Sequence, residues 1–187
     1  MNITNKIIIV VLIGFLSSCS TLKDPVNNNY RIELNSENLS ILNGIYKRSS
    51  ISDTINKKHH CPNNLFHSLF LRPGTFLWNN NSGKDFVEIK VIDKKRIKVT
   101  LTINDKIVKE NTLKGKIVKN TFEFNRRSFI FPLVFMNFYE DRKTRIGSLQ
   151  NGNLSIDTAT ESVGNFFIFP WSGGAYYGDN LEFEKVK

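Results

Sequence analysis

The chain has 187 residues, of which 40% are hydrophobic and 23% are charged, and its formal net charge is +9 at pH 7. This is the composition of an ordinary globular protein, and it excludes disorder throughout. The excess of Lys and Arg favours anionic partners such as phospholipid headgroups or acidic polymers. A basic surface that is merely solvated is the alternative interpretation.

The N-terminus has the pattern of a secretory signal. Lys6 precedes an apolar run of ten residues, 7–16, whereas a membrane-spanning helix needs about 20. A positive residue, a short apolar stretch and small residues before a cleavage site predict a signal peptide rather than a retained span. We expect the signal peptide to comprise residues 1–18.

The run Leu16-Ser17-Ser18-Cys19 resembles the lipobox of bacterial lipoproteins. The resemblance implies cleavage before Cys19, a diacylglyceryl thioether on its sulfur and an acylated amine. A single acyl chain binds membranes only marginally, so three chains on one cysteine would anchor the protein firmly. We expect a lipid-anchored protein of the cell envelope, with the outer membrane favoured over the inner, and no nucleic acid partner.

The mature chain is expected to form one domain behind a tether. Removal of the signal peptide leaves 169 residues, which is enough for one hydrophobic core. Residues 19–38 are polar and include Pro25, so we interpret them as a lipidated flexible tether and residues 39–187 as the domain. With Cys19 acylated, Cys61 has no partner for an intramolecular disulfide.

Alternating apolar and polar residues predict β-strands. Residues 96–103 place four aliphatic side chains on one face, and residues 87–91 repeat the pattern upstream of a turn at residues 93–95. Asn104-Asp105 ends the second of these strands. Further strands are expected at residues 107–113 and 116–124, around Lys114-Gly115, with the position of their turn left open.

The C-terminal third shows the clearest hairpin. Asn151-Gly152 lies between aliphatic residues in the segment 145–157, and Asn-Gly suits a type I′ turn. Strands at residues 166–169 and 180–186, separated by a loop at residues 172–174, complete a set of about eight to ten strands. One short helix is expected at residues 63–71, with a strand at residues 65–72 as the competing interpretation. The spacing favours an all-β barrel or sandwich.

A family resemblance concerns the first strand. Gly44-Ile45-Tyr46 followed by an antiparallel meander over residues 42–187 is similar to a lipocalin-like bacterial lipoprotein. Lipocalins carry Trp at the third position of this motif and pair it with an Arg on the last strand, for which this chain offers Lys185 or Lys187. The resemblance implies an antiparallel up-and-down β-barrel of about 8–10 strands with one short helix.

The histidines and the second cysteine are clustered. His59, His60, Cys61 and His67 are ligand types that zinc and copper accept, but their spacing gives weak support for a metal site. The competing interpretation is a solvated loop with Cys61 packed as a small hydrophobe. Lys57 and Lys58 beside Cys61 could also lower its pKa, which leaves thiol chemistry open. Other catalytic motifs are absent from the sequence, so we expect no enzyme and no cofactor besides the covalent lipid.

Two aromatic segments, residues 128–139 and 165–171, lack alternation. Three interpretations are open: the aromatics are all core, they line a barrel that binds a small apolar or amphipathic ligand, or they dock on a membrane with basic residues such as Arg142 and Lys143 alongside. The ligand-binding interpretation predicts these side chains as the binding residues: Phe129, Phe131, Phe135, Phe138, Phe166, Phe169 and Trp171. Two non-catalytic alternatives are an envelope interaction module and an inhibitor or immunity protein for an acidic partner.

Overall fold

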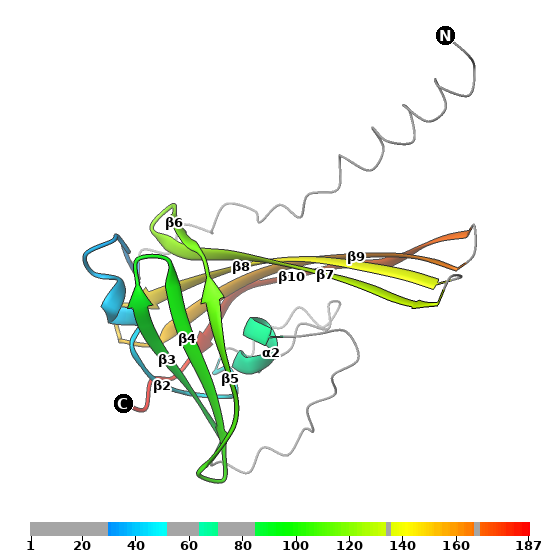
Figure 1. The fold of residues 1–187 in the computed structure, drawn as a ribbon. Coiled ribbons are helices and arrows are strands. Elements are labelled where there is room, and N and C mark those ends of the chain that lie inside the picture. The colour runs from blue at the N-terminus through cyan, green and yellow to red at the C-terminus, as the bar shows by residue number, and fades with distance from the viewer. Residues whose placement is uncertain (1–29, 52–63, 71–84, 134–135, 167–168) are drawn as a thin grey trace.

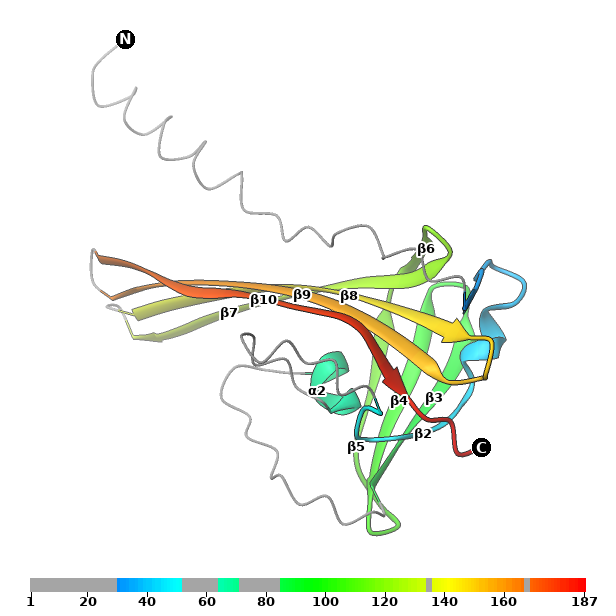
Figure 2. The same ribbon diagram turned by 180° about the vertical axis from the view of Figure 1, so that it is seen from behind.

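The computed structural model describes residues 30–51, 64–70, 85–133, 136–166 and 169–187 (Figure 1). Their strands form two antiparallel sheets, with a short helix between them (Figures 1 and 2). The all-β fold with one short α-helix is therefore confirmed. The predicted signal peptide, the predicted lipidation site and most of the predicted tether lie outside the described residues.

The smaller sheet, here the short sheet, has four strands in the order β2-β3-β4-β5. Their bounds are Gly44–Lys47 for β2, Asp85–Asp93 for β3, Arg96–Ile103 for β4 and Lys106–Lys114 for β5. The alternation predicted from the sequence is present in β4, where Ile97, Val99 and Leu101 are buried. Tight reversals at Lys94-Lys95 and Asn104-Asp105 lie where the sequence predicted them.

The larger sheet, here the long sheet, has the order β10-β9-β8-β7-β6, and β1 (Arg31–Ile32) also pairs with β8. Its strands are β6 (Lys116–Val118), β7 (Thr121–Leu133), β8 (Met136–Leu149), β9 (Leu154–Phe166) and β10 (Phe169–Phe183). The four strands β7 to β10 have 13 to 15 residues each. In both views they extend well past the short sheet and the helix (Figures 1 and 2).

The two sheets meet at two places. On one side, β5 passes into β6 through Gly115, whose N–H donates to the carbonyl of Lys95 at 2.8 Å. On the other side, β2 pairs with the C-terminal residues: the N–H of Ile45 donates to the carbonyl of Lys187, and that of Lys47 to Glu184. Neither sheet is closed into a barrel by itself, so the all-β expectation is confirmed whereas the closed barrel is not.

Several turns differ from the sequence predictions. The hairpin at Asn151-Gly152 is present, but of its residues only Gly152 has a positive φ, 85°. A type I′ turn needs two such residues, so the predicted turn type is wrong, and the N–H of Gly152 instead closes an i to i+3 turn on Leu149. Residues 172–174, predicted as a loop, lie inside β10 at a register shift.

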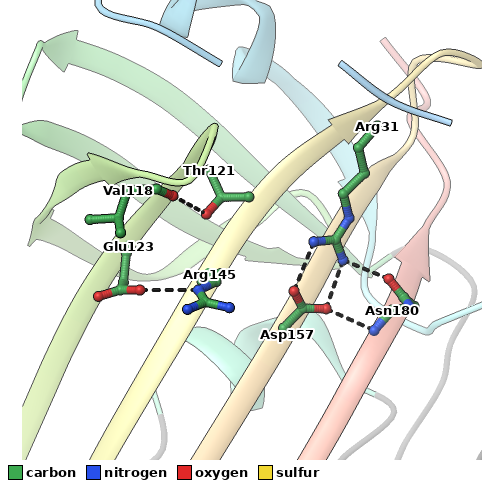
Figure 3. A network of polar contacts seen from close by, with 7 residues as sticks. All are labelled: Arg31, Val118, Thr121, Glu123, Arg145, Asp157 and Asn180. Carbon is green, nitrogen blue, oxygen red and sulfur yellow. Dashed lines mark hydrogen bonds and ion pairs between the residues drawn. The ribbon is translucent and has the colours of Figure 1, made fainter. Parts of the chain in front are cut away.

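The chain reverses at Lys119-Asn120 rather than at Lys114-Gly115. Both turn residues have positive φ, 47° and 61°, as a two-residue hairpin requires. The hydroxyl of Thr121 donates to the carbonyl of Val118 at 2.8 Å and closes the turn (Figure 3). Because of this turn, the segment 116–124 is two strands, β6 and the start of β7, and not one.

Two short helices precede the main meander. The 3₁₀ helix η1 (Leu39–Leu42) places Leu39 and Leu42 in the core. Helix α2 (Leu65–Phe70) lies within the predicted segment 63–71 and excludes the competing strand there. Packing begins ahead of residue 39, because β1 pairs with β8 and Leu34 is only 1% exposed.

Tyr46 is the largest fully buried side chain on β2. Its hydroxyl donates to the carbonyl of Leu42 at 3.0 Å, and burial raises the pKa of the phenol from 10.0 to about 12. Between these two values the unfolded chain loses the proton while the folded chain keeps it, which favours unfolding as the pH rises.

We therefore expect the stability of the protein to fall above pH 10, with a contribution from Tyr46 of up to about 1.4 kcal/mol per pH unit. Denaturant unfolding of the wild type and of Tyr46→Phe should give a stability difference that is constant up to about pH 9. Above pH 10 the difference should change in favour of Tyr46→Phe. An unchanged difference up to pH 12 would contradict the raised pKa.

Candidate functional site

The predicted aromatic residues lie at the far end of the long sheet, where the structure describes the backbone pairing. Ile130 pairs with Phe138, Phe138 with Gly164, and Gly164 with Trp171. A second row joins Leu133, Met136, Phe166 and Phe169. We call these two the aromatic rows. The register therefore brings together two sequence segments that lie more than 25 residues apart.

The remaining predicted binding residues differ in their placement. Phe129 pairs with Tyr139 in a row that continues to Val163, and Val163 is exposed. Phe131 lies in β7, where the register with β8 shifts. Phe135 lies outside the described residues. The structure thus groups Phe138, Phe166, Phe169 and Trp171 in adjacent rows.

Next to the aromatic rows, the same strands carry polar residues. The next row on the same face, two residues along each strand from Ile130, Phe138 and Gly164, consists of Ser128, Glu140 and Ser162. Two positions farther the register joins Arg126, Arg142 and Thr160, here called the arginine row. Glu140, Arg142, Thr160 and Ser162 are buried or half-buried.

The arginine row faces the interior of the protein. Alternation places Arg126, Arg142 and Thr160 on the same face as Phe122, Ile146 and Ile156, which belong to the core. Between the two sets, the hydroxyl of Thr144 donates to the carbonyl of Ser68 on α2 at 3.5 Å. Guanidinium groups therefore lie beside the core on a buried sheet face, just past the helix.

Arg142 contacts Thr160 and Glu140 at neighbouring positions. Its Nε donates to Thr160 Oγ1 at 2.9 Å, and Nη2 lies 3.3 Å from Glu140 Oε1. Burial raises the pKa of the Glu140 carboxyl, against the opposing attraction of Arg142 and Arg126. Two arginines directly opposite each other repel. The arginine row therefore places two guanidinium groups beside the Glu140 carboxylate.

The opposite face of the long sheet carries ion pairs, among them Arg31 with Asp157 and Arg145 with Glu123 (Figure 3). Arg31 makes a bidentate pair with Asp157 at 2.8 and 2.7 Å, and Nη2 also donates to Asn180. The N–H of Asn180, a residue with positive φ, donates back to Asp157. These contacts fasten β1 across β8 to β9 and β10. The carboxylate and the guanidinium neutralise each other.

The predicted metal or thiol cluster is not assembled by the described residues. His59, His60 and Cys61 lie outside them, and His67 is on α2. Within the described ranges no group of three or more His, Cys, Asp or Glu residues could hold a metal ion. The same part of the chain contains no helix long and apolar enough to cross a membrane.

Tyr46, in the motif that resembles lipocalins, is in contact with Lys185 near the C-terminus. Lys185 Nζ lies 5.8 Å from the centre of the Tyr46 ring, and the two residues form a β-bridge. A Cβ on Gly44 would meet the Lys185 side chain and would lie 2.9 Å from the carbonyl oxygen of Lys187. Glycine at position 44 therefore lets the C-terminal residues lie against β2.

Comparison with protein-family models, with curated proteins and with solved structures gives no match for this chain.

Sequence reasoning missed the arginine row. Arg126 belongs to none of the sites predicted from the sequence, and Arg142 is predicted only as a residue that could dock on a membrane. The available signal was the alternation itself: counting in steps of two from Phe122 places Arg126 on the buried face. What the sequence could not supply is the pairing of β7, β8 and β9 that joins the two arginines.

Proposed function

We propose that this protein is a lipid-anchored lipoprotein of the cell envelope that binds an amphipathic ligand and has no catalytic activity. Acylated Cys19 would hold it at the membrane, with the outer membrane favoured, and residues 20–29 would link the anchor to the domain. The lipobox supports the anchor. The ligand site is proposed on the inner face of the long sheet.

We propose further that the two sheets are the halves of a flattened, lipocalin-like up-and-down barrel. Hydrogen bonds between β2 and the C-terminal residues support one seam of this barrel, and the passage of β5 into β6 supports the other. The lysine above the Tyr46 ring supports the resemblance, because a cation from the end of the chain lies where the family has its arginine.

One observation carries the ligand proposal: along β7, β8 and β9, the aromatic rows are followed by the polar row of Ser128, Glu140 and Ser162 and then by the arginine row. Apolar surface binds a hydrocarbon chain, and a buried guanidinium binds a carboxylate or phosphate through charge-assisted hydrogen bonds. An amphipathic molecule with an acidic head fits this order of residues. Its chain would lie along the aromatic rows and its head at Arg126 and Arg142.

The test is a titration of the unacylated chain from Ser20 onward with a fluorescent long-chain fatty acid. We expect saturable binding, and Arg126→Gln should weaken it about tenfold, since a hydrogen bond to a charged group contributes about 1.5–3 kcal/mol. The matched control is Lys106→Gln, which removes one exposed charge at the far end of β5.

Two results would contradict the proposal. Absence of saturable binding by the wild type would exclude the fatty-acid class of ligand. Equal weakening by Arg126→Gln and Lys106→Gln would show that the acidic head responds only to net charge and not to the arginine row. Circular dichroism of both variants checks that the fold is retained.

A further inference from the structure

A cavity lies where the two sheets meet, away from the arginine row. Its volume is about 900 Å³, and it opens between the turn that joins β3 to β4, the passage from β5 to β6, and the first residues of β7. Six cationic residues line it: Lys94, Lys95, Arg96, Lys114, Lys116 and Lys143. Three separate segments of the chain contribute them.

The two carboxylates at this cavity are already engaged. Asp93 accepts from the Lys95 N–H at 2.9 Å and from Arg96 Nε at 2.7 Å, and these contacts lower the pKa of its carboxyl. Glu123 accepts from Arg145 Nε at 3.0 Å and lies 3.2 Å from Lys143 Nζ. The two acidic groups at the cavity are therefore paired with three cations, Arg96, Arg145 and Lys143.

Of the six cationic residues that line the cavity, four lysines are outside these ion pairs: Lys94, Lys95, Lys114 and Lys116. Within the described part of the chain none of them has a carboxylate partner, and all four are exposed. Like charges gathered at a concave surface create a positive potential that attracts anions. The cavity is thus a concentrated positive site within a basic protein.

The backbone fixes this arrangement. The N–H of Gly115 donates to the carbonyl of Lys95, which holds the turn against the strand passage and places Lys95 beside Lys114 and Lys116. A Cβ at position 115 would lie 2.6 Å from the carbonyl oxygen of Glu123 and 2.7 Å from the Phe122 ring. Only glycine fits at position 115. The close approach of the backbone there, and not loop flexibility, brings the lysines together.

We propose that this cavity binds a ligand with two or more phosphate groups. Lysine ammonium groups bind phosphate as point charges, and four of them match more than one phosphate. The volume also exceeds what a single phosphate would fill. The site is independent of the proposed fatty-acid site, because it involves other residues and the strand passage between the sheets. A diphosphate group can come from a soluble molecule or from a lipid headgroup.

The test uses the full acylated protein in nanodiscs of neutral phosphatidylcholine, titrated calorimetrically with inorganic pyrophosphate. We expect saturable binding that weakens as sodium chloride rises from about 50 to about 200 mM, because salt screens exposed charges. Lys94→Gln/Lys116→Gln should weaken it about tenfold. The control Lys90→Gln/Lys106→Gln removes the same charge at exposed positions outside the cavity and should change it less than about twofold.

The second arm distinguishes the two sources of phosphate. The titration is repeated in nanodiscs that contain a lipid with a diphosphate headgroup. Loss of pyrophosphate binding there assigns the site to the headgroup, and unchanged binding assigns it to a soluble ligand. Absence of pyrophosphate binding in neutral nanodiscs, or equal weakening by the two double variants, would overturn the proposal.

Discussion

Asp85→Ala is expected to lower the free energy of unfolding by about 3–5 kcal/mol, because it removes one partner of a buried ion pair. Arg48 Nη1 lies 2.7 Å from Asp85 Oδ2, and each side chain is 3% exposed. The pair connects the end of β2 to the start of β3. Without the carboxylate, the guanidinium stays buried and loses this counter-charge, which is costly.

The matched control is the neighbouring pair of Lys47 and Glu184. Its atoms are 2.6 Å apart, but the side chains are 52% and 44% exposed. Exposed pairs contribute about 0–1 kcal/mol, so Glu184→Ala should have a small effect. Urea unfolding with linear extrapolation measures both variants. Similar losses for Asp85→Ala and Glu184→Ala would contradict the role assigned to burial.

Much of the strand pattern could be predicted from local sequence. In β4, alternation of Ile97, Val99 and Leu101 with polar residues gives both the strand and its buried face, since side chains in a strand alternate with a period of two. Positions such as Asn104-Asp105 are turns for an equally local reason. Such residues tolerate positive φ, and both have it.

Features that depend on distant contacts could not be predicted in this way. Gly115 has the sequence signature of a turn residue, but the space around it is set by Phe122 and Glu123 of β7. Residues 172–174 read as a loop because of two glycines, whereas pairing with β9 keeps them inside β10. Likewise, β1 is placed by distant residues, through its pairing with Leu149 and Ser148 of β8 and the contacts of Arg31 with Asp157.

The candidate site likewise has a part that local sequence predicts and a part that depends on distant contacts. Composition alone picks out the aromatic segments around Phe138 and Trp171, and the register then places these two residues in one row. The arginine row depends on which strands pair, since Arg126 and Arg142 are 16 residues apart and meet across β7 and β8. Sequence reasoning thus finds the residue types, and the pairing of the strands decides which of them meet.

Gly115→Ala is expected to lower the free energy of unfolding by about 1–3 kcal/mol through overpacking. The new Cβ would meet the Glu123 carbonyl oxygen at 2.6 Å and two ring carbons of Phe122 at 2.7 Å. Phe122 is fully buried, so its ring has little room to move. The backbone must shift instead, which would strain the hydrogen bond from the Gly115 N–H to Lys95.

Gly152→Ala is the contrasting variant, because glycine is needed at position 152 for its positive φ and not for lack of space. Its φ is 85°, and nothing lies within 4 Å of the position that a Cβ would take. An L-residue in the left-handed region costs about 1–2 kcal/mol, but the cavity between the sheets is untouched. Both variants should therefore lose stability in urea, whereas only Gly115→Ala should also weaken pyrophosphate binding, since it displaces the lysines on either side. Unaltered pyrophosphate binding by Gly115→Ala would mean that the strand passage does not position these lysines.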